Sequence, residues 1–202
     1  GDTTLTIGAD MVVQGANGTI GYPYYSGGTQ KLVNNGRIAA DVSGGTLYLS
    51  PSHGTTNNGV IEAQNGGTLV LNSNLFGAAG STLNAGTGSQ IVQNGVTLSG
   101  VINTSGSGKL TASNSYNNLL DGVTLNGHLD LTSGGSSERV TNGLTLNGTI
   151  DLDNYGALVF NGDQTLGGSG TVLFGNSGYY LGLEGDTTLT IGADMVVQGA
   201  NG

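Results

Sequence analysis

The sequence has no cysteine, no tryptophan and only two prolines, and only 8% of its 202 residues are charged. Without cysteine the chain can form neither a disulfide nor a thiolate metal site. Its positive charges are Lys31, Arg37, Lys109 and Arg139. A formal net charge of −9 with so few cations argues against nucleic acid as a partner, because phosphate recognition needs clustered positive charge.

Long apolar runs are also missing. No stretch approaches the ~20 apolar residues of a membrane-spanning helix, so we expect no membrane insertion of this segment. The hydrophobic residues instead come in short bursts, such as Thr68–Leu71, Val96–Leu98 and Leu144–Leu146. These bursts are too short for helices and are typical of strands. The 40 glycines, together with Asn, Ser and Asp, lie between the bursts and favour turns.

One segment occurs twice without any change. Residues 1–18 and residues 185–202 both read GDTTLTIGADMVVQGANG. The identity predicts a tandem array, in which 1–184 is one full unit and 185–202 begins the next. The alternative is that one segment was duplicated artificially to stand for a continuing polymer. That origin would still imply a repeating object.

A looser and shorter period lies inside the unit. The segments 94–103, 121–130 and 142–151 resemble one another, at sequence intervals of 27 and 21. The segment 35–40 resembles 58–63, and 44–49 resembles 66–71, at intervals of 23 and 22. Periods of this length are typical of solenoids. Three short strands and three turns use about 22 residues, so the period predicts a parallel β-solenoid of eight to nine coils per unit.

The repeats also predict which side chains stack in the core. One inward column is predicted to contain Ile38, Ile61, Ile102, Leu129 and Ile150. A second is predicted two residues later and contains Ala40, Ala63, Thr104, Leu131 and Leu152. The competing fold is an antiparallel β meander, in which Asn-Gly pairs form hairpin turns. That fold explains the translational repeat less well.

Three segments carry a resemblance to a known class of proteins. They are Gly-Val-Thr-Leu-Asn-Gly at 122–127, Gly-Leu-Thr-Leu-Asn-Gly at 143–148, and 167–174. This pattern resembles the passenger repeats of autotransporters and of filamentous-haemagglutinin-type adhesins. The resemblance implies a right-handed parallel β-helix displayed outside a bacterial cell, for adhesion or as a scaffold. The exact recurrence of 1–18 at 185–202 is unusual for such a passenger and indicates a longer array or filament.

Acidic residues follow the predicted outward column between the two core columns. This column is predicted to contain Ala39, Glu62, Asn103, Asp130 and Asp151. Asp130 and Asp151 fall on adjacent coils, and Asp153 follows on the same side. The three aspartates are interpreted as a solvated acidic face, as a weak calcium site with oxygen ligands, or as the carboxylate pair of a polysaccharide-acting enzyme. The two histidines, His53 and His128, have no partners for zinc or nucleophilic catalysis in the sequence.

Several tyrosines lie in a segment that interrupts the regular spacing of the aliphatic residues. Tyr22, Tyr24 and Tyr25 lie in a segment from Gly21 to Gly28 that is predicted to leave the rod as a loop. Exposed tyrosines make good contact surfaces for sugars or proteins, and Tyr179 and Tyr180 are predicted to join the same patch. The alternative is a loop packed on its own coil.

These features favour a structural protein over an enzyme. The predicted function is a component of an extracellular or cell-surface fibre that needs no cofactor. Its predicted partners are copies of itself, and then glycans or cell surfaces. The alternative is a cell-surface adhesin, and the third hypothesis is the polysaccharide-acting enzyme.

Overall fold

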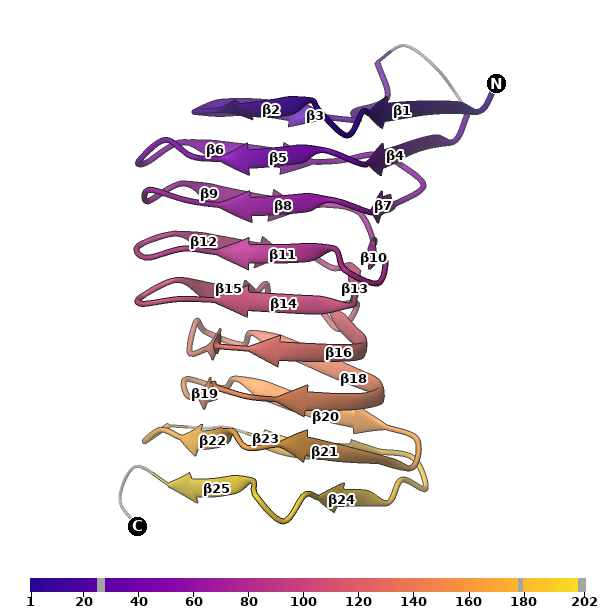
Figure 1. Cartoon of the computed structure of the whole chain (residues 1–202). Helices are drawn as coiled ribbons and strands as arrows, with labels where there is room; N and C mark the ends of the chain where they lie inside the picture. The colour runs from indigo at the N-terminus through magenta and orange to yellow at the C-terminus, as the bar shows by residue number, and fades with distance from the viewer. Residues whose placement is uncertain (25–27, 178–179, 200–202) are drawn as a thin grey trace.

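The chain winds into a parallel β-solenoid (Figure 1). A computed structural model describes residues 1–24, 28–177 and 180–199. Within these ranges no helix is long and apolar enough to cross a membrane. Every strand pairing is parallel, so the antiparallel meander does not occur among the described strands. The predicted solenoid is confirmed.

Each turn of the chain places one strand on each of three faces, and we call the three strands of one turn a rung. Face 1 contains β1 (Thr3–Ile7), β4 (Gln30–Asn34), β7 (Thr55–Asn57), β10 (Leu75–Gly77), β13 (Thr97–Ser99), β20 (Ala157–Asn161), β23 (Tyr180–Glu184) and the first halves of β16 (Leu119–Asn126) and β18 (Ser137–Leu146).

Face 2 contains β2 (Val12–Gly15), β5 (Arg37–Ala40), β8 (Val60–Ala63), β11 (Thr82–Ala85), β14 (Val101–Thr104), β21 (Gln164–Gly168), β24 (Leu189–Ile191) and the second halves of β16 and β18. Face 3 contains β3 (Asn17–Ile20), β6 (Thr46–Leu49), β9 (Thr68–Leu71), β12 (Gln90–Gln93), β15 (Lys109–Ala112), β17 (His128–Leu131), β19 (Thr149–Leu152), β22 (Thr171–Phe174) and β25 (Val196–Gly199). The described chain therefore has nine rungs, from β1–β3 to β23–β25.

The core consists of aliphatic columns that run along the rod. Side chains alternate inward and outward along each strand, so one column forms under each inward position. On face 2 the column contains Ile38, Ile61, Leu83, Ile102, Leu125 and Leu146. On face 3 it contains Leu47, Leu69, Ile91, Leu110, Leu129, Ile150 and Val172.

The single column predicted from Ile38 to Ile150 is therefore wrong in its second half. Ile38, Ile61 and Ile102 stack on face 2, but Leu129 and Ile150 stack on face 3. The second predicted column divides in the same way: Ala40, Ala63 and Thr104 lie on face 2, while Leu131 and Leu152 lie on face 3.

A corner motif used at two different corners causes this error. In 94–103 the motif joins face 1 to face 2, so Ile102 pairs with Leu125 and not with Leu129. In 121–130 the matching residues join face 2 to face 3. The interval of 27 residues between these two segments therefore does not lead from a residue to its register partner on the next rung. Both corners need the same alternation and the same glycine, because their backbones pack tightly on the neighbouring rung. A Cβ at Gly148, for example, would overlap the carbonyl oxygen of Gly127.

The duplicated segment also lies on different faces at its two occurrences. Its first copy forms β1 on face 1 and β2 on face 2, whereas its second copy forms β24 on face 2 and β25 on face 3 (Figure 1). The strands β1 to β23 fill 25 strand positions, because β16 and β18 each cover two faces. Distributed over three faces, these positions make eight and one-third turns. The interval between the two copies therefore shifts the sequence by one face.

Candidate functional site

The predicted neighbourhood of Asp130 and Asp151 is confirmed. The two residues are register partners on the outward side of β17 and β19. The rest of the predicted outward column is wrong, because Ala39, Glu62 and Asn103 lie on face 2. On that face Asn103 belongs to a row of hydrogen-bonded amides. The row contains Asn84, Asn103, Asn126 and Asn147, and each amide donates to the preceding one across 2.9 Å.

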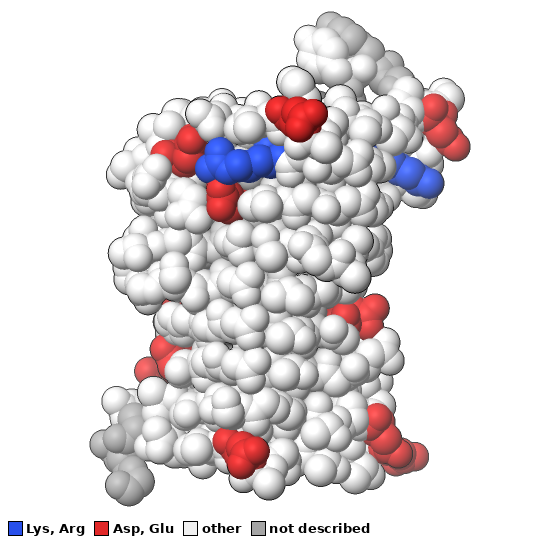
Figure 2. All heavy atoms as spheres, viewed as in Figure 1, with Lys and Arg blue, Asp and Glu red and all other residues white. Residues whose placement is uncertain are grey.

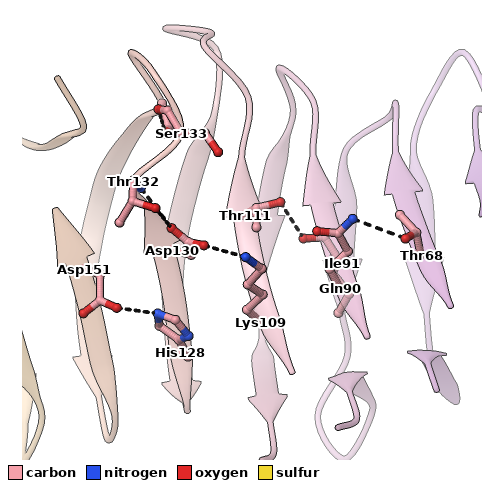
Figure 3. A network of polar contacts seen from close by, with 11 residues as sticks. Thr68, Gln90, Ile91, Lys109, Thr111, His128, Asp130, Thr132, Ser133 and Asp151 are labelled. Carbon is pink, nitrogen blue, oxygen red and sulfur yellow. Dashed lines mark hydrogen bonds and ion pairs between the residues drawn. The ribbon is translucent and has the colours of Figure 1, made fainter. Parts of the chain in front are cut away.

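Asp130 has its carboxylate oxygens engaged by neighbouring donors (Figure 3). Lys109 Nζ donates to Oδ2 across 2.7 Å, while the Thr132 backbone N–H and hydroxyl donate to Oδ1 across 2.9 and 2.6 Å. Burial alone would raise the pKa of Asp130, but the bonds from Lys109 and Thr132 outweigh it and lower that pKa below its ordinary value. Asp130 is therefore held as a carboxylate.

Asp151 is paired with His128 on the preceding rung. The His128 Nε2 and Asp151 Oδ2 atoms lie 2.9 Å apart, and Figure 3 shows the ring directed at the carboxylate. The other oxygen of Asp151, Oδ1, is buried without a hydrogen-bond partner in the described structure. Together with Thr104 and Thr149, the pair lines a shallow groove of about 360 Å³.

Asp153 connects two turns through hydrogen bonds. Its Oδ1 accepts bonds from the Ser177 hydroxyl at 2.8 Å, the Ser177 backbone N–H at 2.9 Å and the Asn154 backbone N–H at 2.7 Å. The Ser177 hydroxyl bond contributes most to lowering the pKa of Asp153. This residue therefore ties the turn after β22 to the turn after β19.

The charged pairs of faces 2 and 3 share one geometry. In each pair the first residue of one strand reaches the third residue of the next strand, as for Lys109–Asp130, His128–Asp151 and Arg37–Glu62. Such a diagonal contact links two successive rungs. Figure 2 shows few charged atoms on the viewed side, with cations beside carboxylates near the N-terminal rungs.

No group of three or more His, Asp or Glu side chains that could hold a metal ion occurs in 1–24, 28–177 or 180–199. Each of Asp130, Asp151 and Asp153 instead has at least one oxygen bonded to a protein group. A calcium site at these residues stays a prediction. What the arrangement does in the described chain is to hold rungs together.

The predicted tyrosine patch is spread over both ends of the rod. Tyr22 and Tyr24 follow β3 in the first rung and are 64% and 74% exposed, whereas Tyr180 begins β23 in the ninth rung (Figure 1). Tyr25 and Tyr179 lie outside the described residues. One copy of the chain therefore does not bring Tyr22 and Tyr180 together.

A second tyrosine surface contains Tyr180 of the predicted patch together with Tyr116 and Tyr155, which were not predicted from the sequence. Tyr116, Tyr155 and Tyr180 line a groove of about 470 Å³ on face 1, which we call the tyrosine groove. Tyr116 and Tyr155 lie in polar turns, 114–118 and 153–156, outside the repeated motifs. The only signal in the sequence was a single aromatic residue within each of these turns.

No protein family matches the chain, and no curated protein or solved structure matches it either.

Proposed function

We propose that the chain is a rod segment of an extracellular or cell-surface fibre whose solenoid rungs stack end to end. The observation that carries the proposal is that aliphatic columns run along the described rungs in register, so that each rung covers the core of the one before it. The resemblance to autotransporter and haemagglutinin-type passengers supports the location outside the cell.

At the N-terminal end, the first rung continues the core columns without being covered. Leu5 lies in register above the fully buried Leu32, yet its side chain is 46% exposed. Val13 lies above Ile38 in the same way and is partly buried. These side chains are exposed because no rung lies on their outer side in this structure.

The C-terminal end has the same character. Leu183, Ile191 and Val197 continue the columns of buried residues on faces 1, 2 and 3, and they are 53%, 39% and 40% exposed. The last strands also present unpaired backbone groups along their outer edge, as any edge strand does. A further rung would bury the aliphatic side chains and pair the backbone groups.

The next rung can come from the continuing chain or from a second copy. Because the first rung of one copy and the last rung of another present opposite edges of parallel strands, the contact is head to tail and does not close on itself. Repeated contacts of this kind give a filament. The hydrogen-bonded ladder and the aliphatic columns then run through the whole fibre and make it stiff.

The test uses the purified 202-residue chain at rising concentration, followed by electron microscopy and sedimentation. We expect rods that lengthen in steps of one unit. The double variant Leu5→Lys with Ile191→Lys places a charge on each open end and should remain monomeric. Val42→Lys is the matched control, because Val42 is 43% exposed in a side loop, and it should assemble like the parent.

A parent chain that stays monomeric at every concentration would leave the end-to-end contact between copies without support. Assembly of the double Lys variant into the same rods would also contradict the proposal. The cell-surface adhesin remains the second candidate function, because the tyrosine groove offers a binding surface on the side of the rod.

A further inference from the structure

The tyrosine groove is lined by small side chains and by aromatic ones. Ser137, Ala157 and Tyr180 are register partners on the outward side of three successive rungs of face 1. Next to them, Val159 is the partner of Gly182. Ser137, Ala157 and Gly182 are small, and they line the groove together with the three tyrosines.

The three tyrosines that line the tyrosine groove are exposed to solvent. Tyr116, Tyr155 and Tyr180 are 81%, 67% and 63% exposed. Exposed tyrosine rings provide a large contact area with little loss of conformational entropy, and they carry a hydroxyl for hydrogen bonding. The rings therefore form an open aromatic surface along the rod.

A buried polar atom in the groove has no partner. Ser137 is only 4% exposed, and its hydroxyl makes no hydrogen bond to any described residue. This hydroxyl oxygen is itself covered by surrounding atoms, so it lies beneath the surface that a ligand would touch. The Asn114 side chain lies in the same lining and offers donors and an acceptor.

The lining carries no Asp, Glu, Lys, Arg or His side chain among the described residues. The nearest ion pair on this face joins Arg139 to Glu184, and it is already internally neutral. Because neither sign of charge is favoured, a charged ligand gains nothing from this groove. The groove instead suits a ligand with apolar faces and many neutral hydroxyls.

A linear polysaccharide has these properties. The apolar faces of its sugar rings can stack on tyrosine, while its hydroxyls can bond to Asn114 and to the tyrosine hydroxyls. Tyr155 and Tyr180 lie on neighbouring rungs, about 4.8 Å apart along the axis, which is comparable with the length of one pyranose residue in an extended chain. The volume of about 470 Å³ also lies within the usual range of small-ligand sites.

We propose that the groove lined by Tyr116, Tyr155 and Tyr180 binds a neutral, extended polysaccharide that lies along the rod axis. The site requires only one copy of the chain. A further rung would cover Leu183 at the end of the groove, whereas Tyr116, Tyr155 and Tyr180 lie on the side of the rod. The site therefore gives the rod a way to attach to a glycan matrix.

The test measures oligosaccharide binding by calorimetry and by tyrosine fluorescence, which no tryptophan obscures. The probes are hexamers of β-1,4-linked glucose and of β-1,4-linked N-acetylglucosamine, with a galacturonic acid hexamer as the charged comparison. All measurements use the Leu5→Lys, Ile191→Lys background, so that assembly and its failure do not affect the result.

We expect a neutral hexamer to bind and the acidic hexamer to bind at least tenfold more weakly. Tyr116→Ser and Tyr155→Gly should each weaken binding at least tenfold. Tyr155→Gly is suited to folding, because Tyr155 has a φ of 66° that glycine adopts without strain. Tyr48→Ser is the matched control on face 3, where Tyr48 is 39% exposed, and it should bind like the parent.

Several results would overturn the proposal. They are the absence of binding to both neutral hexamers, equal binding of the acidic hexamer, and equal losses in Tyr48→Ser and Tyr155→Gly. A fourth is a change in lateral rod association in Tyr116→Ser without any sugar binding by the parent, because the groove would then be a protein contact.

Discussion

At the scale of single residues, the most unusual group is the carboxyl of Glu138, which is fully buried on the inward side of β18. Gln93 Nε2 donates to its Oε1 across 3.4 Å, while Glu138 Oε2 and Gln93 Oε1 have no hydrogen-bond partner in the described structure. Burial raises the pKa of Glu138 well above its ordinary value, and the bond from Gln93 offsets only part of this effect. A neutral carboxyl can donate its proton, which an ionised one cannot.

This raised pKa predicts a pH dependence of stability. The folded chain holds the Glu138 proton more tightly than the unfolded chain, so stability falls as the pH rises above the ordinary glutamate pKa. Glu138→Gln removes this titration. We expect its free energy of unfolding at pH 7 to exceed that of the parent by about 1–3 kcal/mol, with no difference near pH 4. Urea unfolding at several pH values measures both.

Asp130→Asn is the matched comparison, because the pKa of Asp130 is lowered and the sign is reversed. The stabilisation by Asp130 is present above the ordinary aspartate pKa and is lost as the pH falls through the lowered one. Asp130→Asn should therefore destabilise the chain at pH 7 by less than about 1 kcal/mol and have no effect in strong acid. A Glu138→Gln variant that is less stable than the parent at pH 7 would contradict the argument.

At the scale of elements, buried asparagines fix the corner between faces 1 and 2. Asn34 and Asn57 are both buried, and Asn34 Nδ2 donates to Asn57 Oδ1 across 2.9 Å. Asn57 also accepts from the Gly59 backbone N–H and donates to the Thr82 carbonyl oxygen. One side chain thus satisfies polar groups on three successive rungs.

Asn57→Ala should leave several of these groups buried and unpaired. We expect a loss of about 2–4 kcal/mol in the free energy of unfolding, since each buried unsatisfied group costs about 1–3 kcal/mol and water can reach part of the corner. Asn58→Ala is the control, because Asn58 donates to Asn35 in an exposed amide pair at 2.8 Å. Its loss should stay below about 0.5 kcal/mol. Equal losses of unfolding free energy in the two variants would show that the buried Asn34–Asn57 pair stabilises the chain no more than the exposed amide pair does.

The pairing of strands between successive rungs could be predicted from the sequence only in part. The short period and the strand alternation correctly placed Ile38 against Ile61 and Asp130 against Asp151, because one period of the sequence completes one turn. The face on which a strand lies could not be predicted, since the corner motifs of all faces have similar requirements. The partners Lys109 and His128 therefore went unrecognised, because a diagonal contact depends on knowing which strands are neighbours. Tyr116 and Tyr155 were missed because turns carry no periodic signal.

At the scale of the whole molecule, the face shift of the duplicated segment sets the symmetry of any tandem array. A unit of eight and one-third turns carries each feature onto the next face, so three units restore the starting orientation. The tyrosine groove would then face three directions in succession. A rod of this kind presents binding sites all around its axis, whereas a unit with a whole number of turns presents them along one side.

A chain of two consecutive units, each equivalent to 1–184, tests this symmetry by cryo-electron microscopy. We expect the second tyrosine groove to be rotated by one third of a turn and displaced by about 40 Å, at ~4.8 Å per rung. Deleting residues 61–82 from the second unit, which lie between the two grooves, is the control. Ile61 and Leu83 are register partners, so the deletion removes one whole turn. The displacement should shrink by about 4.8 Å while the rotation stays the same. Two grooves on the same face would contradict the face shift. The duplicated segment would then lie on faces 2 and 3 only when no further chain follows it.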